Sequence, residues 1–183
     1  THLSPSEFNK AIESPKSIVV DIRNYYESEV GKFDKAITPN IERSQNLLYK
    51  VKELLRGKEK DKILLYCTGG IRCEKASSFL LKNNFCDVNQ LNGGIINYAK
   101  KVKEKKITSK FRGKNYVFDN RMGERITPDV ISNCHQCQNK NDTHTNCANN
   151  LCHILFIQCP ECNSKYDGCC CSECKNYKNC IHP

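Results

Sequence analysis

The residues best suited to chemistry are a cysteine followed by two glycines and an arginine, Cys67-Thr68-Gly69-Gly70-Ile71-Arg72. An apolar run precedes this segment and a helical pattern follows it, which places the cysteine at a strand-to-helix turn. Backbone N–H groups and the helix dipole at such a turn favour a thiolate. We therefore predict that Cys67 is the catalytic nucleophile and Arg72 a fixed cation for an anionic substrate or intermediate. The alternative is an inert cysteine packed at a strand end.

Other residues are candidates for accessory roles. Thr68, Gly69, Gly70 and Ile71 form the predicted active-site loop. Cys73 directly follows Arg72; it either resolves a persulfide or sulfenic acid on Cys67 or packs on the first helical turn. Asp21 and Arg23 end another apolar run, and we expect them to brace the loop by charge-assisted hydrogen bonds. Cys86 has no neighbouring partner and is predicted to be a buried core thiol.

The last third of the chain is rich in cysteine: eleven of the fourteen cysteines lie between Cys134 and Cys180. Short pairs suit tetrahedral zinc, because each pair supplies two ligands from one turn. We predict about two structural zinc sites, with candidate ligands Cys134, Cys137, Cys147, Cys152, Cys159, Cys162, Cys169, Cys170 and Cys174.

The spacing leaves the partition and the metal open. Adjacent pairs or interleaved pairs could share an ion, and His135, His144 or His153 could replace a thiolate. An iron–sulfur cluster would use the same ligands. Disulfides in a secreted module are the minority alternative, because dense cysteines in a reducing cytosol favour metal thiolates.

The elements that must position the loop alternate between strands and helices. Apolar, β-branched runs predict buried parallel strands at 17–22, 63–66 and 88–91, and helical spacing predicts helices over 41–56, over 74–82 and from Ile95. This alternation predicts an α/β fold with a parallel sheet covered by helices on both faces. We expect a catalytic domain over 1–112, and an irregular cysteine-rich metal-binding module over 113–183.

The net charge of +9 is concentrated in one strip. Between Lys100 and Lys114, eight basic residues stand against the single acid Glu104, with Arg121 and Arg125 beyond them. Such a strip attracts a polyanion such as tRNA by counterion release, although a solvated helix end is the plain alternative. No apolar run is long enough for a membrane span and no leader opens the sequence, so we expect a cytoplasmic protein without membrane contact.

A known family matches these motifs. A cysteine separated by four residues from an arginine resembles the active-site loop of rhodaneses, and Asp21-Ile22-Arg23, Glu27, Gly31 and Leu91-Asn92-Gly93-Gly94-Ile95 match further landmarks of that family. Related phosphatases have five residues between the cysteine and the arginine, to hold a phosphate. The shorter loop here favours a sulfur substrate over a phosphate. The longer string from Cys67 to Ala76, with Val117-Phe118-Asp119 and Cys134-His135-Gln136-Cys137, resembles the bacterial tRNA uridine hydroxylases.

The resemblance implies oxygen-dependent 5-hydroxylation of the wobble uridine of tRNA, with molecular oxygen as co-substrate and the cysteine at Cys67 as the active-site residue. The family usually has a small α/β domain upstream; without it, we expect the chain to keep the chemistry and bind tRNA poorly. One alternative is a rhodanese-type sulfurtransferase that carries a persulfide on Cys67. Another is a non-catalytic zinc-containing adaptor, which would not need Cys67 and Arg72.

Overall fold

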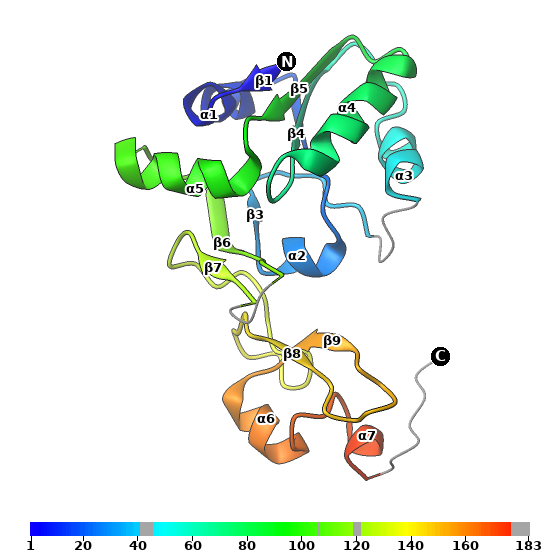
Figure 1. The fold of residues 1–183 in the computed structure, drawn as a ribbon, viewed down its shortest axis with the longest axis vertical. Coiled ribbons are helices and arrows are strands. Elements are labelled where there is room, and N and C mark those ends of the chain that lie inside the picture. The colour runs from blue at the N-terminus through cyan, green and yellow to red at the C-terminus, as the bar shows by residue number, and fades with distance from the viewer. Residues whose placement is uncertain (41–45, 106, 119–121, 177–183) are drawn as a thin grey trace.

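The computed structural model describes the chain except for residues 41–45, 106, 119–121 and 177–183. Its larger part is built on a four-stranded parallel sheet in the order β1-β5-β4-β2 (Figure 1). The strands are β1 (His2–Leu3), β2 (Ser17–Asp21), β4 (Lys62–Tyr66) and β5 (Asp87–Leu91). The helices of this part are α1 (Pro5–Glu13), α2 (Tyr25–Glu29), α3 (Leu47–Leu54), α4 (Ile71–Lys82) and α5 (Gly94–Lys105).

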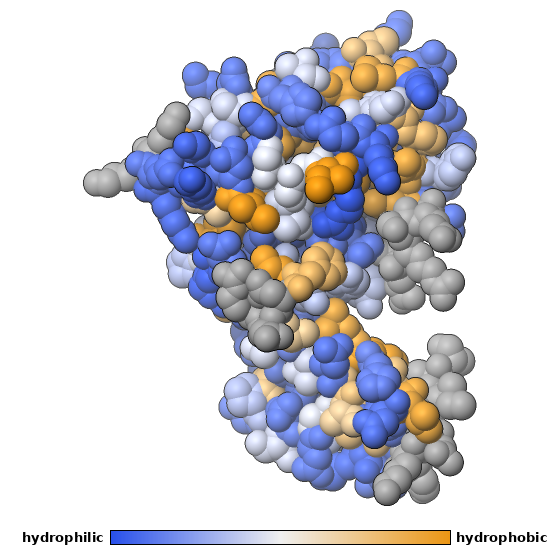
Figure 2. Space-filling view, in the orientation of Figure 1, coloured by the Kyte–Doolittle hydropathy of each residue, from blue (hydrophilic) through white to orange (hydrophobic). Residues whose placement is uncertain are grey.

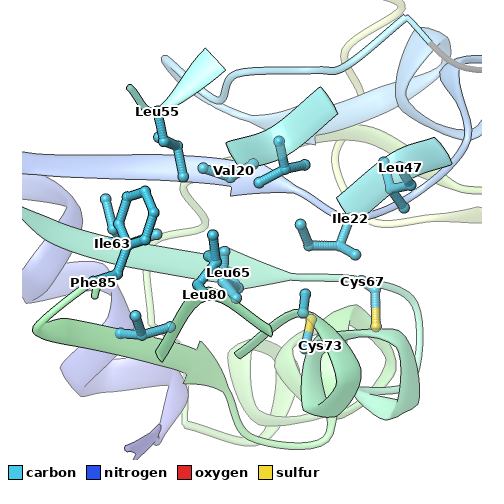
Figure 3. Close-up of a cluster of buried hydrophobic side chains, with 13 residues drawn as sticks. Val20, Ile22, Leu47, Leu55, Ile63, Leu65, Cys67, Cys73, Leu80 and Phe85 are labelled. Atoms are coloured by element: carbon cyan, nitrogen blue, oxygen red, sulfur yellow. The ribbon is translucent and has the colours of Figure 1, made fainter. Parts of the chain in front are cut away.

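Helices cover both faces of this sheet, and each face has its own apolar core. On one face α3 and α4 pack on the sheet, where Leu47 and Leu80 belong to the same buried cluster as Leu65 (Figure 3). On the other face Phe8 of α1 and Tyr98 of α5 pack against strand residues. Alternate strand residues thus point into two cores, which is why β2 and β4 contain continuous apolar runs, Ile18 to Val20 and Ile63 to Tyr66. The predicted α/β architecture is confirmed.

The strands and helices predicted from apolar spacing are present, with shifted ends. Helix α4 begins at Ile71, three residues before the expected start, because Gly70 has a left-handed backbone (φ 96°) and serves as its N-cap. The sequence analysis missed α1, although Ser4, Pro5 and Glu7 form a capping box with proline in the first turn. It also missed the single-turn helix α2. Part of the helix expected over 41–56 lies outside the described residues.

A second group of elements continues from the sheet toward the C-terminus. Strand β3 (Gly31–Phe33) pairs with β6 (Phe111–Asn115), and β6 pairs with β7 (Glu124–Arg125), both antiparallel. The cysteine-rich segment holds a hairpin of β8 (His144–Asn146) and β9 (Leu155–Ile157), then α6 (Pro160–Tyr166) and α7 (Ser172–Asn176). The boundary expected between 112 and 113 falls inside β6, whose Phe111 packs in the core beside α5.

None of the helices in the described part of the chain combines the length and the apolar character that crossing a membrane requires.

Candidate active site and metal centres

Cys67 lies directly after β4, at the carboxyl edge of the sheet. Cys67 as a whole is 1% exposed, so the loop encloses nearly all of this residue. The amide of Gly70 donates to Cys67 Sγ at 3.1 Å. The Cys73 thiol, which donates to the same sulfur, is the largest influence on the pKa of Cys67. Burial opposes it, but the backbone amides of Cys73 and Gly70 and the charge of Arg72 add to it, and the pKa falls to about 6. The sulfur is therefore a thiolate at neutral pH.

The orientation of the loop depends on the start of α5. The amides of Ile95 and Ile96 donate to the carbonyl oxygens of Cys67 and Thr68 at 3.0 and 3.1 Å. Gly94 has a φ of +64°, and a Cβ there would lie 2.5 Å from the carbonyl oxygen of Cys67. Only glycine permits this approach. Since α5 binds the loop carbonyls, the loop amides are left facing the sulfur.

Arg72 is held by a buried glutamate that the sequence analysis had treated only as a landmark. Its two terminal nitrogens donate to Glu27 at 2.6 and 2.8 Å, and Nη2 also donates to Thr68 Oγ1 at 3.0 Å. The Glu27 side chain is fully buried. Burial raises the pKa of Glu27, but Arg72 more than offsets this, so the net pKa is lowered and the carboxylate is charged. The arginine charge, expected to be available to an anion, is thus paired within the protein.

Cys73 lies beneath Cys67 in the first turn of α4, and it is fully buried. Figure 3 shows both cysteines at one end of the same apolar cluster. The hydrogen bond to Cys67, and then burial, raise the pKa of Cys73 well above its usual value. The two thiols are therefore unequal: Cys73 keeps its proton and Cys67 gives its own up.

Asp21 and Arg23 form a fully buried ion pair, with Arg23 Nη2 2.6 Å from Asp21 Oδ2. The Tyr66 hydroxyl donates to the same oxygen at 2.7 Å, and Arg23 Nη2 donates to the Gly31 carbonyl at 2.7 Å. The pair thus connects the ends of β2 and β4 to β3. Tyr66, the last residue of β4, directly precedes Cys67. In the described part of the chain, the side chains of this pair form no hydrogen bond with the 67–72 loop itself.

The expectation for Cys86 was wrong: this thiol is exposed. Phe85, its neighbour, takes the buried position instead.

Eight cysteines gather into two groups that could each hold a metal ion. Within each group all four sulfurs lie within 4.8 Å of one another; the groups are Cys134, Cys137, Cys159 and Cys162, then Cys147, Cys152, Cys170 and Cys174. The pairs interleave, since the first joins the third and the second joins the fourth. Sulfur separations of 3.6 Å (Cys137 to Cys159) and 3.8 Å (Cys152 to Cys170) fit a tetrahedral ion, for which a Zn–S bond of about 2.3 Å gives edges of about 3.8 Å.

Three groups of sequence candidates fall outside these two sets. Cys169 is buried next to the second set but belongs to neither. His144 Nε2 lies 3.1 Å from the Tyr26 carbonyl and His135 Nε2 lies 2.6 Å from Glu29, so both contact α2. His153 also belongs to neither set. In the part of the chain that the structure describes, both sets consist of thiols alone.

The basic strip is more neutral than the sequence indicated. Six of its basic side chains face six carboxylates, and five of these acids come from outside the strip: Glu13, Asp34, Glu124, Asp129 and Asp142. The side chains of Lys105 and Lys106, and all of Arg121, lie outside the described residues. Arg125 also pairs with Asp142. Among the described side chains, the positive charges of the strip are therefore largely paired with carboxylates.

A family model described as the rhodanese-like domain matches residues 4–101, and one described as rhodanase C-terminal matches 112–175. The chain belongs to the rhodanese-like family. It is 57% identical, over 96% of its length, to a protein of Leptospira interrogans named tRNA uridine(34) hydroxylase. It is 52% identical, over 95% of its length, to a protein of the same name from Yersinia enterocolitica.

The chain spans about half the length of these curated relatives, 48% and 50%. Among solved structures, a rhodanese-like domain protein from Staphylococcus aureus aligns with 54% of this chain and 90% of its own, at 22% identity and a TM-score of 0.44.

Proposed function

We propose that this chain carries the catalytic centre of a tRNA-modifying enzyme that hydroxylates C5 of the wobble uridine, with molecular oxygen as co-substrate. The observation that carries the proposal is the Cys67 thiolate, which the loop amides and Cys73 stabilise. Relatives at 57% and 52% identity that are named tRNA uridine(34) hydroxylase support the choice of substrate. In the proposal Cys67 is the nucleophile, and Thr68 to Arg72 hold it in place.

The second candidate is a sulfurtransferase that carries a persulfide on Cys67, which the rhodanese-like family favours. A doubly charged donor such as thiosulfate would need positive charge beside the sulfur. Glu27 already neutralises Arg72 at 2.6 Å, so an uncharged base is the better fit. A cyanide-dependent thiocyanate assay separates the two activities.

Two zinc ions are the proposed occupants of the cysteine sets, and we propose that they order the cysteine-rich segment around β8, β9, α6 and α7. Closed sites of four thiolates are typical of structural zinc, and they leave no position open for a substrate. When bound, zinc would supply folding free energy that this polar segment lacks. Because the proposed reaction modifies tRNA, we also propose that tRNA is the partner of the protein and that the protein works in the cytoplasm.

The test uses cells that lack the gene and carry the full-length protein in its place. We expect Cys67→Ala to abolish 5-hydroxyuridine in tRNA, measured by mass spectrometry of nucleosides, because the nucleophile is removed. Cys86→Ala, which changes an exposed cysteine, should leave the level unchanged. Unchanged 5-hydroxyuridine with folded Cys67→Ala protein would overturn the proposal, and thiocyanate production lost in the same variant would favour the sulfurtransferase.

A further inference from the structure

Two exposed isoleucines flank the loop that holds Cys67. Ile71 is the first residue of α4 and is 79% exposed, and Ile96 is the third residue of α5 and is 50% exposed. The amide of Ile96 donates to the Thr68 carbonyl at 3.1 Å, while Ile71 directly follows Gly70. Figure 2 shows hydrophobic atoms over the starts of α4 and α5 on one face of the molecule. Both side chains thus lie beside the loop, from different helices.

The fold does not require isoleucine at either position. Side chains this exposed gain little from burial, and a β-branched residue in a helix is slightly unfavourable compared with a straight polar one. A single exposed apolar residue is ordinary, as at Leu54 and Leu81 on α3 and α4. Two at the edges of one reactive loop place apolar side chains on both sides of it, which the core does not explain.

The charges around the loop favour an uncharged ligand at this surface. Glu27 pairs with Arg72, and Asp21 pairs with Arg23, so both nearby cations are neutralised within the protein. Cys67 itself adds a negative charge when ionised. A dianion would be repelled by the sulfur, and the two arginines of the site already hold carboxylates, whereas a neutral ring would meet no such repulsion.

We propose that Ile71 and Ile96 form the binding surface for an uncharged pyrimidine ring. Their side chains contact the ring and hold it over the Cys67 loop. This inference rests on the proposed function, which identifies the ring as the uracil of the wobble nucleotide. Single-stranded RNA loops are recognised by splaying bases out of the stack onto protein side chains. A base moved in this way loses its stacking neighbours, and apolar contacts on the protein offset that loss.

The test measures how well RNA protects Cys67 from iodoacetamide, using the full-length protein and mass spectrometry of the Cys67 peptide. The probes are an anticodon stem-loop with uridine at the wobble position and the same stem-loop with an abasic wobble position. We expect the uridine RNA to protect and the abasic RNA to fail. Ile71→Ala and Ile96→Ala should each raise the RNA concentration for half-maximal protection roughly tenfold.

Leu81→Ala is the matched control, because Leu81 is 51% exposed on the same helix as Ile71 but lies at its far end. It should behave as the unchanged protein. Equal protection by the abasic RNA, or unchanged protection in both isoleucine variants, would overturn the inference. If Cys67→Ala still abolishes 5-hydroxyuridine in that case, the proposed function stands and only the pyrimidine surface falls. The rate without RNA reports whether each variant keeps its loop intact.

Discussion

At the scale of single residues, the site depends on an unequal pair of thiols. Cys67 and Cys73 lie in the same loop-helix junction, yet the pKa of one is lowered to about 6 and that of the other is raised. The largest cause of both shifts is one hydrogen bond, in which Cys73 donates and Cys67 accepts. Cys73 is therefore a positioning residue for the thiolate, whether or not it later forms a bond with Cys67.

Cys73→Ala is expected to raise the pKa of Cys67, because removing a donor destabilises the thiolate relative to the thiol. Thiolate should then form only at higher pH, whereas in the unchanged protein it forms as the pH rises through about 6. Cys73→Ser keeps a donor and should shift the pKa less. The measurement is the ultraviolet thiolate absorbance against pH, with the matching Cys67→Ser protein subtracted. Equal titration in all three proteins would contradict the assignment.

At the scale of elements, the loop is shaped by the start of α5 as much as by its own sequence. The carbonyls of Cys67 and Thr68 accept from the first amides of α5, and Gly94 is the point of closest approach. The Asp21 and Arg23 pair holds the ends of β2 and β4, directly before Cys67. The neighbouring helix α5, not the loop alone, therefore decides which way the loop amides face.

Gly94→Ala should therefore reduce hydroxylation strongly, because its Cβ would meet the Cys67 carbonyl oxygen at 2.5 Å and push the loop away. Gly57→Ala is the control: its φ of +80° imposes similar backbone strain, but no atom lies within 4 Å of the added Cβ. Both variants should lose roughly 1 kcal/mol of stability from backbone strain. This strain should therefore lower the midpoint of thermal unfolding by a similar amount in both. Activity retained in Gly94→Ala would mean that α5 does not position the loop.

At the scale of the whole molecule, sheet and cysteine-rich segment are ordered by different forces. The sheet has two apolar cores, whereas the segment around β8 and β9 buries mainly cysteines with Phe156. The interleaved thiol pairs join four separate stretches of this segment. Metal binding would therefore fix its whole topology at once.

Native mass spectrometry should find two metal ions per chain, and Cys134→Ser or Cys147→Ser should each lose one, because each variant removes a thiol from a different set. Cys169→Ser should keep both. Chelation should unfold the cysteine-rich segment while the parallel sheet keeps its circular dichroism. Loss of an ion from Cys169→Ser would show that this thiol is a ligand and that the grouping differs in the metal-bound protein.

The sequence by itself determined what depends on local pattern. Apolar runs and helical spacing predicted β2, β4, β5, α4 and α5, but not α2, which carries Glu27. Glycines before an arginine marked Cys67, because backbone freedom and thiolate stabilisation act over a few residues. Short cysteine pairs likewise indicated metal sites. The sequence did not determine which pairs share a site, because spacing along the chain carries no information about which pairs lie together in space.

Only the tertiary structure decided which charges are paired. Glu27 neutralises Arg72 across 45 residues of sequence, and Glu13, Asp34 and Asp142 neutralise a strip that the sequence shows as strongly basic. Coulomb interactions depend on distance in space, which folding sets and sequence order does not. Folding likewise decides which apolar side chains are buried: Cys86 is exposed beside a buried Phe85, and Ile71 and Ile96, from different helices, lie exposed beside one loop.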